Sequence, residues 1–210
     1  NDTFTASLEF SGDELKRAID KTVWAVSTEQ TRYYLGGIAL QIDGGVATFV
    51  ATDGHRLVRY RRKDITSETD TSMIIQRKAL NLLKSTLPTD ETPVKADFTA
   101  SNAFFSFGNI RMICRLIDER FPDFENAIPT NNPNTLTIGR VELLNSLRRI
   151  AIYSNRATHQ IRLKMTLNNL VVSAEDIDYA NEAKEQLICE YNGDDLEIGF
   201  NAKFLIEMLS

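Results

Sequence analysis

Cysteine, histidine and long apolar runs are scarce in this chain. Its 210 residues include two cysteines, Cys114 and Cys189, and two histidines, His55 and His159. The cysteines lie far apart in strand-like runs and form no CxxC motif, so we interpret them as buried apolar side chains rather than as a disulfide or a zinc-ligand pair. No apolar run approaches the roughly 20 residues that span a membrane, and no signal sequence opens the chain. These absences favour a cytoplasmic protein without a metal site.

Motifs for phosphate binding and nucleophilic catalysis are also missing. The chain has no GxxxxGK loop, no GxSxG elbow and no dinucleotide-binding glycine pattern, so we expect no cofactor and few parts for catalysis. Of its 5 prolines, Pro122, Pro129 and Pro133 fall with a run of asparagines between positions 121 and 134. They interrupt the periodicity there and predict a boundary between two domains. Because the first residue is not Met, we also expect the chain to come from a longer protein.

An internal repeat is the most informative pattern that is present. Bulky apolar residues recur with a second and third apolar residue five and nine positions later: Phe10, Leu15, Ile19; Ile138, Leu143, Leu147; Phe200, Leu205, Leu209; and, less perfectly, Ile75 with Leu80. The four starting residues are 65, 63 and 62 positions apart. An interval of this size indicates that one supersecondary unit is duplicated along the chain.

Each repeat reads as a strand, a helix and three further strands. Alternating apolar residues up to Phe10 give way to helical spacing after Ser11, which we expect to cap the first helix. The pairs Asp43-Gly44 and Asp53-Gly54 predict hairpin turns. The expected strands are 37–43, 46–53, 56–63, 71–76, 94–99, 103–107, 111–117, 135–138, 161–167, 170–174 and 183–191, with helices at 77–87 and 140–154. A fourth strand and helix begin at Leu196 and the chain ends within that helix, which favours a fragment.

Positive charge is concentrated in the expected helices. The chain carries a formal net charge of -5, which argues against nucleic acid if the sum alone is considered. The second helix, however, has Arg77, Lys78 and Lys84 without an acid, while acidic residues crowd the strands and loops. Two interpretations remain open: a basic helical face that attracts phosphate, or ordinary solvated helix surfaces.

The most distinctive string is Val50-Ala51-Thr52-Asp53-Gly54-His55-Arg56-Leu57. By itself it predicts a hairpin, in which His55 is a surface side chain or a structural hydrogen-bond donor. Asp53 with His55 also fits acid-base chemistry, but no nucleophile or third orienting group lies nearby in the sequence. An enzyme of this kind is one rival interpretation, and a repeat-built scaffold without a nucleic-acid role is another.

Three more strings accompany it in order: Arg32-Tyr33-Tyr34-Leu35, Arg120-Phe121-Pro122-Asp123-Phe124 and Glu197-Ile198-Gly199-Phe200-Asn201. Together they resemble the bacterial sliding clamp, the beta subunit of DNA polymerase III, over the whole chain. The resemblance implies α+β DNA clamp domains with sheets outside and helices lining a channel. Residues 1–126 correspond to the middle domain with two repeat units, and residues 127–210 to part of the C-terminal domain.

The resemblance implies a non-catalytic processivity factor. Two full-length subunits form a homodimer ring around duplex DNA without reading its sequence. Short peptide motifs of DNA polymerase III, the clamp loader and repair proteins dock in a hydrophobic pocket between the middle and last domains. No membrane partner is implied.

The resemblance also assigns these roles to particular residues of this chain. The implied DNA-facing residues, each equally compatible with an ordinary solvated side chain, are Lys16, Arg17, Lys21, Tyr33, Tyr34, Lys78, Lys84, Arg148, Arg149 and Lys203. The two tyrosines either approach DNA or support the pocket. The implied pocket residues are Arg32, Leu35, Thr52, Gly54, His55, Arg56, Leu57, Pro122, Ala127, Asn201 and Phe204.

Two pocket positions depart from the family pattern. Ala127 stands where a larger aliphatic residue is usual, and Phe204 stands where Tyr is common. The usual C-terminal wall of the pocket is missing as well, so we expect weakened peptide binding.

The helix from Arg140 gives a separate indication of an interface. Its apolar arc is formed by Leu143, Leu144, Leu147, Ile150 and Ala151, and Ile152 and Tyr153 fall on the other side. Exposed apolar residues of this kind mark an interface, and the resemblance implies that they close the ring against a second subunit. The alternative is that both side chains pack under the loop at 155–159.

Overall fold

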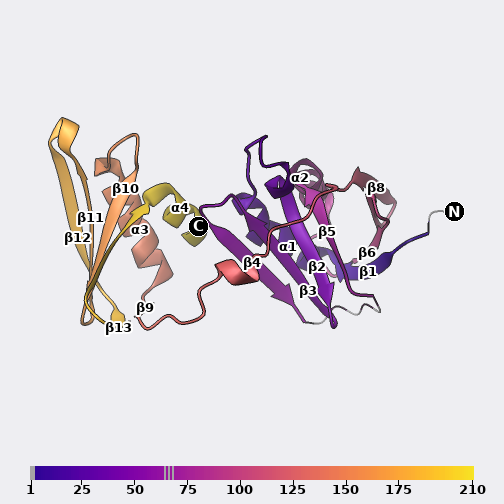
Figure 1. The fold of residues 1–210 in the computed structure, drawn as a ribbon, viewed down its shortest axis with the longest axis horizontal. Coiled ribbons are helices and arrows are strands. Elements are labelled where there is room, and N and C mark those ends of the chain that lie inside the picture. The colour runs from indigo at the N-terminus through magenta and orange to yellow at the C-terminus, as the bar shows by residue number, and fades with distance from the viewer. Residues whose placement is uncertain (1–2, 64, 66, 68) are drawn as a thin grey trace. The chain divides into compact units, whose positions relative to one another are not determined.

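The computed structural model describes residues 3–63, 65, 67 and 69–210. The chain divides into two compact α+β units, Asn1–Asp123 (unit 1) and Phe124–Ser210 (unit 2), and each is described by itself. Figure 1 shows their helices and strands. Among the described residues, no helix has the length and apolar character needed to cross a membrane.

Unit 1 contains two copies of a strand, helix and three-strand module. The first copy consists of β1 (Ala6–Ser11), α1 (Gly12–Thr22), β2 (Gly37–Asp43), β3 (Val46–Thr52) and β4 (Leu57–Arg62), with the short 3-10 helices η1 (Val23–Ala25) and η2 (Tyr33–Leu35) after α1. The second copy consists of β5 (Thr71–Gln76), α2 (Arg77–Thr86), β6 (Pro93–Phe98), β7 (Asn102–Phe107) and β8 (Ile110–Arg115).

The two copies exchange their first strands. One antiparallel sheet has the order β1-β6-β7-β8 and the other has the order β4-β3-β2-β5. Thus β1 pairs with β6 of the second copy, while β5 pairs with β2 of the first. An isolated bridge between Ile75 and Leu116 links the two sheets.

Alternation along the strands gives the sheet β1-β6-β7-β8 a core face and an exposed face. In β1, Ala6, Leu8 and Phe10 are buried while Ser7 and Glu9 are exposed. The same period of two follows β7, as expected for antiparallel sheets that cover a core on one side. In the other sheet of unit 1, consecutive residues of β2 and β3 are buried, so both faces of its central strands are largely covered.

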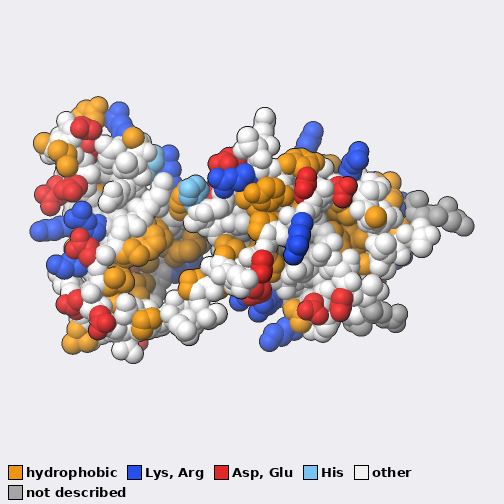
Figure 2. All heavy atoms as spheres, in the orientation of Figure 1, with side chains coloured by type: hydrophobic (Ala, Val, Ile, Leu, Met, Phe, Trp, Pro, Cys, Tyr) orange, Lys and Arg blue, Asp and Glu red, His pale blue; other side chains and the backbone are white. Residues whose placement is uncertain are grey.

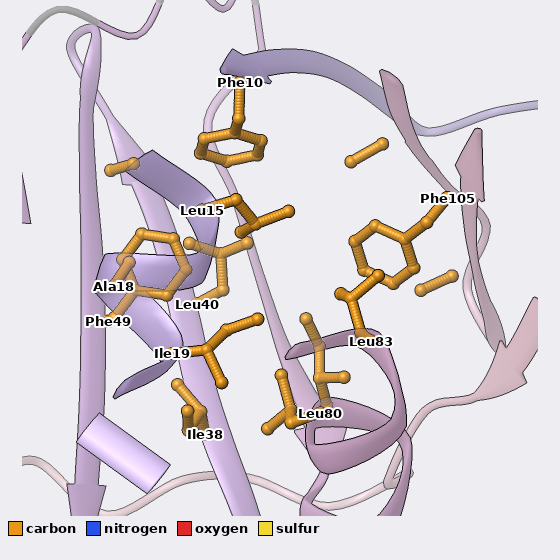
Figure 3. Close-up of a cluster of buried hydrophobic side chains, with 14 of the residues drawn as sticks. Phe10, Leu15, Ala18, Ile19, Ile38, Leu40, Phe49, Leu80, Leu83 and Phe105 are labelled. Carbon is orange, nitrogen blue, oxygen red and sulfur yellow. The ribbon is translucent and has the colours of Figure 1, made fainter. Parts of the chain in front are cut away.

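The helices pack together and share one core with both sheets. Figure 3 shows Leu15, Ala18 and Ile19 of α1 converging with Leu80 and Leu83 of α2. Side chains from both sheets complete this cluster, among them Ile38, Leu40, Phe49, Phe10 and Phe105. Because the apolar stripe of each amphipathic helix turns inward, its charged stripe is left on the surface.

The turn chemistry differs in detail from the sequence expectation. The β2–β3 hairpin closes on Gly44 and Gly45, both with positive φ, rather than on Asp43-Gly44. At the next hairpin only Gly54 has a positive φ, of +89°. Ser11 occupies the N-cap position of α1, yet its hydroxyl donates to Asp13 Oδ1 at 2.8 Å instead of accepting from the helix backbone. The predicted N-cap position of Ser11 is confirmed, but its side chain makes no capping hydrogen bond.

Unit 2 contains a third module and the start of a fourth. Its elements are η3 (Glu125–Ala127), β9 (Thr135–Thr137), α3 (Arg140–Ile150), η4 (Ala151–Tyr153), β10 (Gln160–Thr166), β11 (Asn169–Asp176), η5 (Ile177–Tyr179), β12 (Asn181–Ile188), β13 (Glu190–Asn192), β14 (Leu196–Asn201) and α4 (Ala202–Leu209). The larger sheet has the order β12-β11-β10-β14, and β13 pairs with β9. The pairing of β14 with β10 repeats the strand exchange of unit 1.

Two predicted elements of unit 2 are divided. The expected strand 183–191 ends at Ile188 and resumes at Glu190, because its last part leaves β11 to pair with β9. The expected helix 140–154 is α-helical only to Ile150 and then tightens into the 3-10 turn η4. Ser154 ends this turn in an extended conformation, and its hydroxyl donates to the carbonyl oxygen of Ala151 at 2.7 Å.

Candidate functional site

The loop between β3 and β4 is shaped by two of its own side chains. Thr52 and Leu57 are the last paired residues of the hairpin. The Thr52 hydroxyl donates to the carbonyl oxygen of Arg56 at 2.7 Å and accepts from the N–H of Gly54 at 3.1 Å. Asp53 Oδ1 accepts from the N–H groups of His55 at 2.9 Å and Arg56 at 3.1 Å. These bonds hold residues 52–57 in one conformation without help from a ligand.

Arg56 is anchored at both ends of its guanidinium. Its Nε lies 3.2 Å from Asp53 Oδ2, and its Nη2 donates to the carbonyl oxygen of Trp24 at 3.2 Å. Burial by itself raises the pKa of Asp53, but hydrogen bonds from the His55 and Arg56 backbone and the charge of Arg56 together lower that pKa below its ordinary value. The Asp53 carboxylate is therefore a structural anion that braces the loop.

This arrangement removes the main support for acid-base chemistry at Asp53 and His55. Both oxygens of Asp53 accept hydrogen bonds from the loop itself, at His55 N, Arg56 N and Arg56 Nε. A general base needs its lone pairs directed at a substrate proton, and those of Asp53 are directed at the loop. Within the described residues, no group of three or more His, Cys, Asp or Glu side chains could hold a metal ion.

The segment around η2 lies against the same loop. Arg32 Nη1 donates to the carbonyl oxygen of Asp53 at 3.4 Å, and Arg32 Nε pairs with Glu29 at 3.1 Å. Gly54 has a φ of +89°, which favours glycine, and a Cβ added there would lie 2.5 Å from Arg32 Nη1, so the end of the Arg32 side chain would have to shift. Leu35 closes η2 and is buried. The structure thus brings together the pocket residues that the sequence places at 32–35 and 52–57.

The remaining pocket residues occupy other parts of the chain. Pro122 is exposed near the end of unit 1, whereas Ala127 is exposed in η3 of unit 2. Asn201 caps α4, with its Oδ1 accepting from the N–H of Lys203 at 3.0 Å. Phe204 is half-buried in α4. Asn201 also lines a hollow of about 240 Å³ with four residues that the sequence analysis did not assign to the pocket: Thr158, Gln160, Gly199 and Phe200.

The helix pair of unit 1 exposes more positive than negative charge. Together α1 and α2 carry six basic and three acidic side chains. Of the acids, Glu14 pairs with Arg62 on β4, and Asp20 pairs with Lys84 at 2.6 Å. The other predicted DNA-facing residues of these helices are exposed or half-buried: Lys16, Arg17, Lys21 and Lys78. On the face drawn in Figure 2, charges of both signs are interspersed with hydrophobic side chains.

The predicted basic residues of unit 2 are in different electrostatic settings. Arg149 Nε and Nη2 donate to the two carboxylate oxygens of Glu185 on β12 at 2.7 and 2.8 Å. This bidentate pair lowers the pKa of Glu185 to about 2 and raises the pKa of Arg149. Arg148 and Lys203 are exposed. The charge of Arg149 is therefore already balanced within the unit. Arg149 is for this reason a weaker candidate for attracting phosphate than Arg148 or Lys203.

Exposed aromatic and aliphatic residues lie in the two 3-10 turns η2 and η4. Tyr33 is exposed and Tyr34 is half-buried in η2. In η4, Ile152 is 78% exposed and Tyr153 is 42% exposed, so the alternative that Ile152 packs under the loop at 155–159 does not hold. Exposed apolar side chains also occur elsewhere, for example at Ile177 and Ile188, so the exposure of η4 alone does not assign an interface.

Comparisons with known proteins agree along the whole chain. The family model for the DNA polymerase III beta subunit, central domain, matches residues 9–123, and the model for the C-terminal domain of the same subunit matches residues 125–210. The chain is 34% identical to the beta sliding clamp of Pseudomonas aeruginosa over 206 residues, which cover 97% of this chain and 56% of that protein. It is 30% identical to the beta sliding clamp of Escherichia coli K12 over 211 residues, which cover 100% of this chain and 57% of that protein.

Solved structures give the same result. The sliding clamp of Pseudomonas aeruginosa bound to griselimycin matches with a TM-score of 0.94 and 32% identity, covering 100% of this chain and 57% of that one. The clamp of Bartonella birtlesii bound to griselimycin matches with a TM-score of 0.90 and 30% identity, at the same coverage. The chain spans a little over half the length of these relatives. By its two consecutive domain matches and its fold, the chain belongs to the DNA polymerase III beta subunit family of sliding clamps.

Proposed function

We propose that this chain works as the central and C-terminal part of a DNA sliding clamp, a non-catalytic processivity factor that encircles duplex DNA. The observation that carries this is the paired helices of unit 1. Their apolar stripes fill the core, and Arg17, Lys21 and Lys78 remain on the surface. Such cations attract the phosphate backbone without reading base sequence, which suits a protein that slides.

Retention on DNA circles tests encirclement. A clamp of family length that contains these 210 residues is loaded by its clamp loader onto nicked circular DNA. We expect it to stay on circles and to leave when the circle is cut, since topology rather than affinity holds it. Equal loss from circles and linear DNA would contradict the proposal and favour a scaffold without a nucleic-acid role.

The basic helix residues are tested by charge removal. Replacing Arg17, Lys21 and Lys78 together by Ala should weaken binding to short duplex DNA and flatten its salt dependence by roughly one unit of slope per lost phosphate contact. Lys164 on β10 is an exposed lysine outside the helices and supplies the control Lys164→Ala. If the triple variant and the control bind DNA alike, the helices do not face the duplex.

We further propose that the loop 52–57 with the segment around η2 forms the unit 1 part of a peptide-binding surface. Arg32, Thr52 and Arg56 are fixed by intramolecular bonds, and Leu57 is only half-buried. A preorganised surface with one accessible aliphatic side chain suits short disordered motifs of DNA polymerase III, the clamp loader and repair proteins, because little protein ordering is needed on binding. A dissociation constant near 1 μM corresponds to about 8 kcal/mol and allows partners to exchange.

Griselimycin, with which two of the similar clamps were solved, is proposed as a ligand of the same surface. Leu57→Ala should weaken both griselimycin and a labelled polymerase C-terminal peptide, measured by titration. Leu167→Ala is the matched control, because Leu167 is 80% exposed on unit 2. Equal affinities for wild type and Leu57→Ala would remove this assignment.

The exposed pair Ile152 and Tyr153 supports a role in closing a homodimer ring. Replacing Ile152 by Asp in a clamp of family length should shift the dimer toward monomers in sedimentation, since a charge would be buried without a partner. Unchanged sedimentation at every protein concentration would show that η4 lies outside the interface.

A further inference from the structure

One residue outside the predicted pocket makes two separate contacts with Arg56. The carbonyl oxygen of Trp24 accepts from Arg56 Nη2 at 3.2 Å. The Arg56 guanidinium also lies over the Trp24 ring, with Cζ 5.1 Å from the ring centroid. An arginine stacked on a tryptophan and bound at its edge loses most of its freedom, because both the plane and the direction of the guanidinium are set.

Trp24 is itself held in place without the loop. It lies in η1, directly after α1, and its Nε1 donates to the carbonyl oxygen of Lys21 at 2.8 Å. The half-buried indole packs against the hydrophobic core of unit 1. Contacts with α1 and the core therefore fix the orientation of the Trp24 ring, and they do so before any ligand binds.

Asp53 completes the arrangement from the opposite direction. Its Oδ2 lies 3.2 Å from Arg56 Nε, while its Oδ1 accepts from the loop backbone. The guanidinium thus joins two structures that are distant in sequence, the end of α1 and the turn of the β3–β4 hairpin. If the guanidinium were displaced, the interaction with Asp53 Oδ2 would be lost, and Asp53 would no longer be fixed in the position from which it binds the loop backbone of His55 and Arg56.

We propose that Trp24 is a positioning residue for peptide binding: its ring and backbone carbonyl fix Arg56, and through Arg56 they hold the 52–57 loop in its ligand-ready form. This rests on the proposed peptide-binding function. Trp24 acts through Arg56 and Asp53 and needs no contact with the ligand.

The first test is spectroscopic, because Trp24 is the only tryptophan among the 210 residues. In the ligand-free chain, Arg56→Ala should change the tryptophan emission, since it removes the cation above the indole. Arg115→Ala, on the exposed strand β8, is the control and should leave the emission unchanged. An identical emission spectrum in wild type and Arg56→Ala would overturn the proposal.

The second test measures affinity for griselimycin, used as the probe, on a clamp of family length that contains these 210 residues. Trp24→Leu should weaken binding roughly threefold to tenfold, whereas Trp24→Phe, which keeps an aromatic face, should recover most of the loss. In an Arg56→Ala background, Trp24→Leu should cause no further loss, as a double-mutant cycle requires for residues that act in one pathway. Full additivity of the two losses would mean that Trp24 only fills the core, and would overturn the proposal.

Stability and the control variant Leu57→Ala separate the possible failures. Thermal unfolding shows whether the Trp24→Leu protein folds. If it does not fold, the griselimycin affinity of Trp24→Phe and the tryptophan emission of Arg56→Ala test the role of Trp24 instead. If Leu57→Ala binds griselimycin like wild type, the peptide-binding function itself fails. If Leu57→Ala weakens binding but folded Trp24→Leu does not, the binding function stands and the role of Trp24 is rejected.

Discussion

Arg149 of α3 and Glu185 of β12 form a bidentate ion pair, with N–O distances of 2.7 and 2.8 Å. The pair ties a helix to the edge strand of the larger sheet in unit 2. Parallel hydrogen bonds of this kind are directional as well as charged, so they fix the position of the side chains on both elements. It also means that a residue expected to face DNA has an intramolecular partner.

Glu185 should make the stability of unit 2 depend on acid pH. Its pKa falls from 4.5 to about 2 on folding, so its contribution is present above pH 4.5 and is lost as the pH falls from 4.5 toward 2. Glu185→Gln should lower the melting temperature at pH 7, and the difference from wild type should shrink through this window. Glu190→Gln, on the exposed side of β13, is the control. A difference that stays constant down to pH 2 would contradict the role of the ion pair.

Gly54→Ala should be more damaging than an ordinary glycine substitution. Gly54 has a φ of +89° and a Cβ there would lie 2.5 Å from Arg32 Nη1. The strained backbone costs about 1 to 3 kcal/mol, and the end of the flexible Arg32 side chain has to move as well. Gly108→Ala is the matched control, because Gly108 also has a positive φ but a Cβ added there would meet no atom within 4 Å. Urea denaturation of both variants measures the excess, and equal losses would show that Arg32 yields freely.

We expect replacement of two leucines of α2 to have very different effects on the stability of the protein. Leu80 is fully buried between helix and sheets, so Leu80→Ala should lower the free energy of unfolding by about 2 to 5 kcal/mol. Leu82 is 56% exposed on the same helix, and Leu82→Ala should change the free energy of unfolding by less than about 0.5 kcal/mol. Denaturant unfolding compares them directly. A large loss at Leu82 would indicate a contact that this surface makes elsewhere.

The pair of Asp20 and Lys84 should moderate the charge of the helix face. Their side chains are well exposed and lie 2.6 Å apart, so Asp20→Asn should alter stability by only about 0 to 1 kcal/mol. If the helices face DNA, the same change should tighten duplex binding and steepen its salt dependence, because Lys84 loses its partner. Glu91→Gln, an exposed acid in the loop before β6, provides the control. Equal DNA affinities for wild type and Asp20→Asn would argue against a DNA-facing Lys84.

The secondary structure was predictable where it depends on local pattern. Strands β2 and β5 have the expected bounds, and the α+β clamp fold is confirmed by the family and structure matches. Alternation and helical spacing are properties of neighbouring residues. Because the pattern repeats along the chain, the strand and helix assignment of one module supported that of the others. The division of strand 183–191 was not predictable in this way, because the pairing of β13 with β9 depends on a strand about 50 residues earlier.

The candidate site was predictable only as a set of residues. The resemblance to sliding clamps grouped positions 32–35 with 52–57, but the sequence gave no sign that Trp24 contacts Arg56 or that Arg149 contacts Glu185. Both contacts join side chains more than 30 positions apart, and no periodicity reports on such pairs. A single tryptophan beside a helix end usually has a polar partner for its N–H, which here is the Lys21 carbonyl oxygen, but this rule does not identify Arg56.

The exchange of β1 and β5 bears on how such a protein could arise. In unit 1 the first strand of each module pairs with the other module, β1 with β6 and β5 with β2, so separating the modules would leave the edges of β6 and β2 unpaired. The strand pairing of unit 1 is that of a strand-swapped dimer whose two copies lie in one chain. Its halves, expressed as separate polypeptides, should reassociate with each other rather than persist as independent monomers.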